Sequence, residues 1–154
     1  MSADPNWTKW IKASCAKYFN DTLNSSLPMF VEGDDRPNVG SRTRCELRLD
    51  GPIITQQNPT YWILETVIDI LVVTIRNNTD IYEHDANVGL VVSAFKDGIT
   101  VYKYGDDPFA EVGCLWLAPQ NGKDIIVSNF GQIANDTKVM QSTVEGHYLL
   151  QLKV

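Results

Sequence analysis

One apolar stretch, residues 61–75, limits the possible folds of this chain more than any other feature. Its fifteen residues are mostly β-branched, aromatic or otherwise apolar, and Glu65 and Asp69 are the charged exceptions. Side chains of these types pack well on a pleated surface, so the stretch predicts a strand rather than a helix. At about 3.3 Å per residue this strand would span roughly 50 Å, whereas a typical strand has about five or six residues.

Apolar side chains line both faces of this predicted strand. One face carries Trp62, Leu64, Ile68, Ile70 and Val72. The other face combines Glu65 and Asp69 with Tyr61, Ile63, Val67, Leu71, Val73 and Ile75. A strand that is apolar on both faces is normally covered on both. Two arrangements follow: a central strand within a monomer, or a strand whose excess length is covered by a neighbouring subunit.

A shorter strand is predicted just before this stretch. Residues 44–49 alternate strictly, with Cys45, Leu47 and Leu49 on a dry face and Arg44, Glu46 and Arg48 on a wet face. Asp-Gly-Pro at 50–52 then predicts a break, because Asp and Gly tolerate turn dihedrals and Pro removes a hydrogen-bond donor. Residues 56–59 predict a second break. The region 42–75 therefore predicts a strand, a turn and a second, unusually long strand.

The flanking sequence alternates between helix and strand patterns. Helical spacing predicts a helix over 4–27, and its aromatic face carries Trp7, Trp10 and Tyr18. This face either packs on the sheet or contacts a partner protein. A second helix is predicted over 80–96, from a capping-like acidic pair to an Asp-Gly stop. Residues 33–41 predict a polar arm, and further strands are predicted at 29–32, 99–104, 109–118, 125–133 and 139–152.

This order of elements predicts an α+β class. We expect one domain over residues 1–154, with a mainly antiparallel sheet, a long central hairpin and two helices packed on one face. The last strand alternates cleanly, with Val144, Tyr148 and Leu150 on its dry face and Glu145 and His147 on its wet face.

The charge balance argues against several classes of function. A net charge of −6 and a pI near 4.8 oppose nucleic-acid binding, which needs clustered cations to neutralise phosphates. The N-terminal residues lack a secretory signal pattern, and no stretch approaches 18 uncharged apolar residues, so neither secretion nor a membrane span is expected. Three widely spaced cysteines predict reduced thiols that fill the core.

Motifs for catalysis or cofactor binding are not found. The chain has neither of the glycine-rich phosphate-binding patterns, and its His and Cys spacing matches no zinc site. His84 lies on the apolar stripe of the second helix, which indicates a structural histidine, while His147 is predicted to be solvated or at an interface. We therefore expect no enzyme, cofactor or metal. An enzyme that uses either histidine with a carboxylate or thiol is the minor alternative.

Several stretches together resemble one known family. These are RCELRLDGP at 44–52, the long apolar strand, the helix at 80–96 and VEGHYLLQL at 144–152. They are similar to small neck proteins of tailed bacteriophages, the head–tail connector and tail-terminator proteins. The resemblance implies a structural α+β subunit of a ring, typically a hexamer, that ends the tail tube and joins it to the head while DNA passes through its lumen. It carries over no catalytic residue.

The resemblance also implies partners and a location. The partners would be further copies of this chain and other neck, connector and tail-tube proteins, with no membrane and no specific nucleic-acid binding. The location would be the tail or neck of the virion, after assembly in the host cytoplasm. On this basis Arg42, Arg44 and Arg48 are expected to meet acids of the next subunit, either Asp106 and Asp107 or Glu111. The candidates for the interface are Arg42, Arg44, Arg48, Tyr61, Ile63, Glu65, Asp106 and Asp107.

A second function class stays open at this point. The same elements suit a non-viral α+β module that binds a small ligand or another protein without catalysis. Such a module would hold its ligand in a pocket between a helix and the sheet. Binding of a small molecule would then shift the melting temperature, whereas a ring protein would show a large mass in solution.

Overall fold

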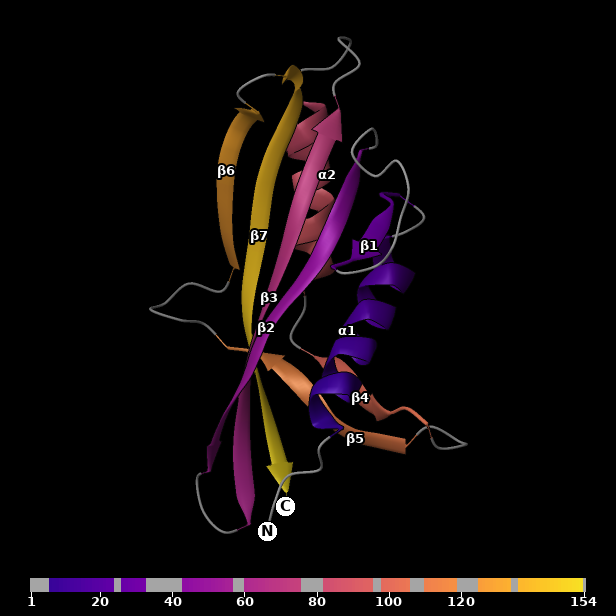
Figure 1. Ribbon diagram of the computed structural model, residues 1–154, viewed down its shortest axis with the longest axis vertical. Helices are drawn as coiled ribbons and strands as arrows, with labels where there is room; N and C mark the ends of the chain where they lie inside the picture. The colour runs from indigo at the N-terminus through magenta and orange to yellow at the C-terminus, as the bar shows by residue number, and fades with distance from the viewer. Residues whose placement is uncertain are drawn as a thin grey trace.

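The strands and helices occur in the predicted order. The computed structural model describes residues 6–23, 26–32, 43–56, 60–75, 82–95, 98–105, 110–118, 125–133 and 136–153 (Figure 1). Within these ranges the elements are α1 (Trp7–Leu23), β1 (Met29–Val31), β2 (Arg44–Gln56), β3 (Tyr61–Ile75), α2 (Glu83–Ala94), β4 (Ile99–Lys103), β5 (Ala110–Leu117), β6 (Ile125–Ile133) and β7 (Asp136–Lys153). The protein is therefore α+β. Neither described helix is long and apolar enough to cross a membrane.

The long strand β3 lies at the centre of the sheet. It pairs with β2 on one edge and with β7 on the other, in the order β1-β2-β3-β7-β5-β4. The second edge of β7 is shared, because β6 pairs with one end of it and β5 pairs at Leu149 and Tyr148. The monomer itself therefore covers both edges of β3, as expected for a central strand.

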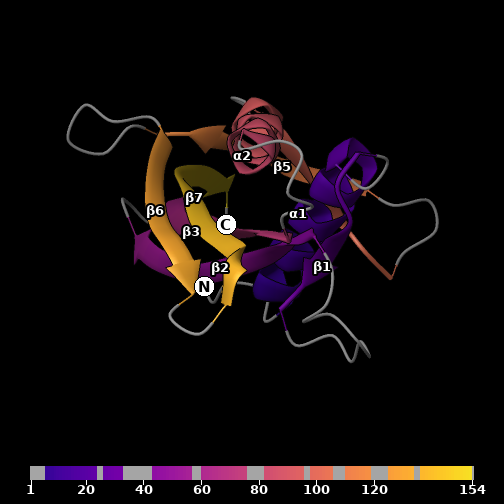
Figure 2. The same cartoon turned by 90° about the horizontal axis from the view of Figure 1, so that it is seen from above.

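The sheet is mixed, which corrects the prediction of an antiparallel arrangement in one respect. β1 runs parallel to β2, with Met29 opposite Cys45, whereas the other pairings of the described strands are antiparallel. A three-residue strand has too few side chains to indicate its direction from sequence. The sheet also curls, so that β6, β7, β3 and β2 form an arc with α1 and α2 on the same side (Figure 2).

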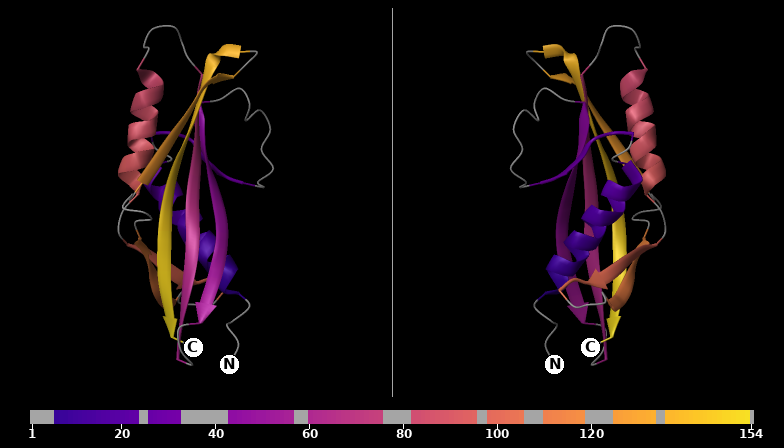
Figure 3. Two further views of the ribbon diagram at one scale, coloured as in Figure 1. Left: turned by 90° about the vertical axis from the view of Figure 1, so that its left-hand side faces the viewer. Right: turned by 90° about the vertical axis from the view of Figure 1, so that its right-hand side faces the viewer.

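The core lies between this arc and the helices. On β3 the buried residues Leu64, Ile68, Ile70 and Val72 face the helices and share one core cluster with Trp7, Trp10, Ile11 and Phe19 of α1. The aromatic face of α1 thus packs inside the protein, the first of the two roles predicted for it. The Tyr18 hydroxyl donates a hydrogen bond of 2.7 Å to the carbonyl of Ala94, which ties α1 to the end of α2. In the right-hand view of Figure 3, α1 crosses in front of the strands and α2 lies beside their upper part.

The predicted break at 50–52 is wrong, because β2 continues through it as a β-bulge. The register with β3 shifts between Asp50 and Ile53. Gly51 adopts φ +97°, and a Cβ at this position would lie 2.8 Å from the carbonyl oxygen of Glu65. Only glycine meets both conditions without strain. The bulge also changes the alternation, so that Asp50 and Ile53 both project from the same face of the sheet.

His84 belongs to a buried polar network that joins α2 to three strands. Ser142 donates its hydroxyl proton to Asn129 Oδ1 at 2.7 Å, so its oxygen accepts a proton from His84 Nε2, also at 2.7 Å. His84 Nδ1 then accepts from the Thr74 hydroxyl at 2.8 Å, and that hydroxyl accepts from Asn87 at 3.0 Å. Both ring nitrogens are occupied and the residue is 4% exposed. His84 is therefore a structural histidine, as predicted.

Candidate functional site

The sheet has a second face, turned away from α1 and α2, which we call the outer face. It is buried at the end that carries Leu71, Val73 and Val139 and partly exposed elsewhere. It consists of alternate residues of β2, β3 and β7 together with Trp116 of β5. Among the predicted interface residues, this face brings together Arg44, Arg48, Tyr61, Ile63 and Glu65. Glu111 lies elsewhere, on β5 opposite Tyr102. Arg42, Asp106 and Asp107 lie outside the described residues, as does the whole of the predicted arm at 33–41.

Charged residues occupy the centre of the outer face. Its described part carries two arginines, Arg44 and Arg48, and five carboxylates, those of Glu46, Asp50, Glu65, Asp69 and Glu145. Arg44 Nε lies 3.0 Å from Glu46 Oε1, and Arg48 Nη2 lies 3.8 Å from Glu46 Oε2. Both arginines thus contact the same carboxylate, that of Glu46 on their own strand, and their pairing with acids of a second subunit stays a prediction.

A half-buried row of charges crosses three strands at this centre. Arg48 lies opposite Asp69, and Asp69 lies opposite Glu145. Burial raises the pKa of Asp69, and the charges of Glu145, Asp50 and Glu32 add to this effect, whereas Arg48 opposes it. The row therefore has an excess of negative charge in a partly desolvated position, which is unfavourable for the isolated monomer.

His147 extends the acidic centre along β7. Its Nε2 lies 3.0 Å from Glu145 Oε1, and its Nδ1 lies 4.0 Å from Glu65 Oε1. Its side chain is 15% exposed, so the predicted wet position is only partly solvated. The described residues contain no group of three or more His, Cys, Asp or Glu side chains arranged to hold a metal ion.

Three buried polar atoms at this centre have no hydrogen-bond partner among the described residues. They are Arg48 Nε, Asp69 Oδ1 and His147 Nδ1. Roughly nine in ten buried polar groups in proteins have a hydrogen-bond partner, so three unpaired atoms in neighbouring rows need an explanation. The centre of the outer face therefore has both excess negative charge and unused hydrogen-bonding capacity.

One end of the outer face exposes large apolar side chains. Ile53 is 63% exposed and Trp116 is 66% exposed, and both belong to one row across β2, β3, β7 and β5, with Glu65 and Leu149 between them. A shallow cleft of about 300 Å³ lies beside Trp116, lined by Ile63, Leu117, Ala118, Leu149 and Gln151. Sequence reasoning missed Trp116, although its position between Leu115 and Leu117 in a predicted strand places it on the opposite face from both.

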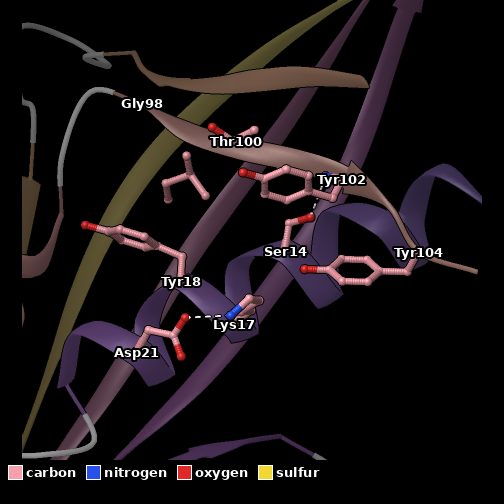
Figure 4. Close-up of a pocket in the computed structure, with 9 residues that line it drawn as sticks. Ser14, Lys17, Tyr18, Asp21, Gly98, Thr100, Tyr102 and Tyr104 are labelled. Carbon is pink, nitrogen blue, oxygen red and sulfur yellow. Dashed lines mark hydrogen bonds and ion pairs between the residues drawn. The ribbon is translucent and has the colours of Figure 1, made fainter. Parts of the chain in front are cut away.

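A second candidate site lies between α1 and β4 (Figure 4). It is a cleft of about 230 Å³ in which Tyr18, Tyr102 and Tyr104 surround the opening and Lys17 and Asp21 close one side. Lys17 Nζ lies 2.8 Å from Asp21 Oδ2, and this hydrogen bond and charge raise the pKa of Lys17. Ser14 Oγ accepts the backbone N–H of Tyr102 at 3.0 Å and so fixes β4 against the helix.

Comparison with known proteins supports the fold. No family model matches the chain, and no curated protein matches it. One solved structure, of a protein whose name states neither a family nor an activity, covers 93% of this chain and 94% of its own, with a TM-score of 0.59 and 11% sequence identity. At this identity the likeness establishes a shared α+β architecture over nearly the whole chain and nothing about activity.

Proposed function

We propose that this chain is a structural subunit of the neck of a tailed bacteriophage. Copies would assemble into a ring, hexameric as the resemblance implies, that ends the tail tube and joins it to the head with DNA in the lumen. The observation that carries the proposal is the outer face, whose apolar end and half-buried charged centre have no helix or second sheet packed over them among the described residues.

The apolar end supports assembly on energetic grounds. Large exposed apolar patches in soluble proteins usually mark interaction sites, and tryptophan is enriched among residues that dominate binding energy. Trp116 and Ile53 each expose more than half of their surface at this end. Contact with a second subunit would remove this area from water at about 25 cal/mol per Å².

The length of the strands supports a rigid contact surface. β2, β3 and β7 contain 13, 15 and 18 residues, and together they continue past α1 at one end of the molecule (Figure 1). β3 is paired on both edges along its length, so this extension is a three-stranded ribbon rather than a single strand. A ring needs two different patches that complement each other, and a stiff ribbon can present one of them.

The mass of the purified chain in solution tests the proposal directly. We expect a species several times heavier than the 17.3 kDa chain, and negative-stain images of this species should show a closed ring with a central hole. A monomer across the whole accessible concentration range would contradict self-assembly.

Replacing Trp116 with alanine is expected to abolish the ring without unfolding the subunit. The side chain is 66% exposed, so its removal leaves the core intact, whereas the loss of an interface tryptophan typically weakens association by about 2 kcal/mol or more. Size-exclusion chromatography with light scattering measures the outcome. The matched control is Tyr82→Ala, since Tyr82 is 67% exposed beside α2 and lies off the outer face. A ring that survives Trp116→Ala would show that the apolar end is not the interface.

A ligand-binding module is the second candidate function, and the cleft between α1 and β4 favours it. The cleft combines aromatic rings with Ser14, Thr100 and a Lys17–Asp21 pair, which suits a small hydroxylated ligand. A panel of monosaccharides and nucleosides should then raise the melting temperature, because ligands that bind only the folded state stabilise it. The variant Thr100→Trp, which fills the cleft, should remove any such shift.

A further inference from the structure

The exposed face of α1 is basic. Lys9, Lys12 and Lys17 project from it, and the small residues Ala13 and Ala16 lie between them. Lys17 pairs with Asp21, but Lys9 and Lys12 are exposed and form no ion pair with a described residue. The chain has a net charge of −6, so this helix face is a positively charged patch on a negatively charged protein.

The outer face has the complementary character. It carries five carboxylates against two arginines, and Asp69 Oδ1 is a buried acceptor without a donor among the described residues. The two faces point away from each other, because α1 lies on the opposite side of the sheet (Figure 3). One subunit therefore cannot bring its own α1 lysines to its own outer face, but two neighbouring subunits can.

We propose that the basic face of α1 in one subunit docks on the acidic centre of the outer face of the next. This contact rests on the ring proposed above and specifies its chemistry. Lys9 and Lys12 supply ammonium donors to Asp69 and Glu145, while the small side chain of Ala13 beside them allows the helix to approach the strands closely. The contact joins two different patches on opposite sides of the subunit, the arrangement that closes a ring by rotation.

The charge row across the sheet explains why the acceptor lies at this position. Arg48 already contacts Glu46, and Glu145 already contacts His147, so Asp69 is left as the half-buried carboxylate with an unused oxygen. An incoming lysine beside the partly exposed side chains of Asp69 and Glu145 offsets the repulsion between their charges. Since these charges are only partly buried, added salt should weaken the contact.

Two charge-altered variants test the contact. The first is Lys9→Glu with Lys12→Glu, and the second is Asp69→Asn with Glu145→Lys. Each variant alone should run as a monomer, with its apparent association weakened about tenfold or more, because each brings like charges together at every interface. Mixed in equal amounts, the two should restore the ring mass, since every interface of an alternating ring then pairs opposite charges.

The controls separate this contact from folding and from the ring itself. Circular dichroism and the melting temperature should show that both variants stay folded, and Asp85→Lys on the exposed side of α2 should leave the ring intact. If the wild-type chain forms a ring and each variant alone forms the same ring, the contact is wrong and the ring stands. The same holds if the mixture of the two variants stays monomeric. A wild-type chain that is monomeric overturns the ring and this contact together.

Discussion

Replacing Phe95 with alanine is expected to lower the free energy of unfolding by about 3–5 kcal/mol, the usual range for deleting a buried phenylalanine. Phe95 is 6% exposed and follows directly after α2. Its ring lies between Phe19 of α1, at 5.3 Å between ring centroids, and Tyr148 of β7, at 6.3 Å. One side chain thus joins both helices to the sheet, so its loss opens a cavity that three elements share.

The backbone beneath Phe95 limits how far this cavity can collapse. Gly146 of β7 lies under the ring, where even a Cβ would approach two ring carbons to 2.8 Å. Glycine has no side chain that could move into the vacated space. Urea denaturation of wild type and variant measures the loss. Leu90→Ala, at a position 39% exposed on α2, should change stability by much less. A loss below about 1 kcal/mol for Phe95→Ala would contradict this packing.

Replacing His84 with alanine is expected to lower the free energy of unfolding by about 2–5 kcal/mol, the range for large-to-small changes in a core. The change removes hydrogen bonds to Thr74 at 2.8 Å and to Ser142 at 2.7 Å. The Thr74 hydroxyl proton then has no acceptor in a position that is fully buried, which adds about 1–3 kcal/mol. A loss below about 1 kcal/mol would show that the network contributes little.

The same residue predicts how stability depends on pH. Burial lowers the pKa of His84, and the charge of Asp85 only partly opposes this. Below the usual histidine pKa of about 6.5, the unfolded chain binds a proton that the folded chain still excludes. The contribution of His84 to stability is therefore complete above about pH 6.5 and is lost as the pH falls from there to its folded-state pKa.

The difference in the free energy of unfolding between wild type and His84→Ala isolates this effect, because the carboxylates titrate in both proteins and their contribution cancels. Urea titrations at about pH 7.5 and about pH 5.5 should give a larger stability difference between the two proteins at the higher pH. Leu90→Ala should follow the wild-type pH dependence. A stability difference that is equal at both pH values would mean that folding leaves the pKa of His84 unchanged, and a larger difference at the lower pH would mean that folding raises it.

The spacing of apolar residues along the sequence was enough to predict the helices and strands that have one buried face. The alternation of β7 and the helical stripe of α1 both follow from side chains that must avoid water, and their periods differ clearly. The grouping of Leu64, Ile68, Ile70 and Val72 on one face of β3 was predicted from period two, but the sequence did not indicate which face of β3 packs on the helices. The structural role of His84 was also visible, because it falls on an apolar stripe.

Features that depend on distant partners could not be predicted in this way. The Asp-Gly-Pro tripeptide suits a turn or a bulge equally well, and only the pairing with β3 selects the bulge at Gly51. Likewise, Asp69 and Glu145 are 76 positions apart, and the charged row exists only through the register of β3 on β7. Period two correctly placed Tyr61, Ile63 and Glu65 on one face of β3, while their role in an interface stays a prediction.

The pairing of β3 also has a mechanical consequence. All fifteen residues of β3 are in register with β7, and eleven residues of β2 are in register with it on the other edge. The hydrogen bonds of an antiparallel ladder run perpendicular to the strands, so tension along β3 loads them together in shear rather than one after another. The ribbon of β2, β3 and β7 is thus the stiffest axis of the subunit. A pulling force along the ribbon would be resisted by the whole ladder. A force that peels the edge strand β6 away from β7, perpendicular to the strands, would break its pairs one at a time.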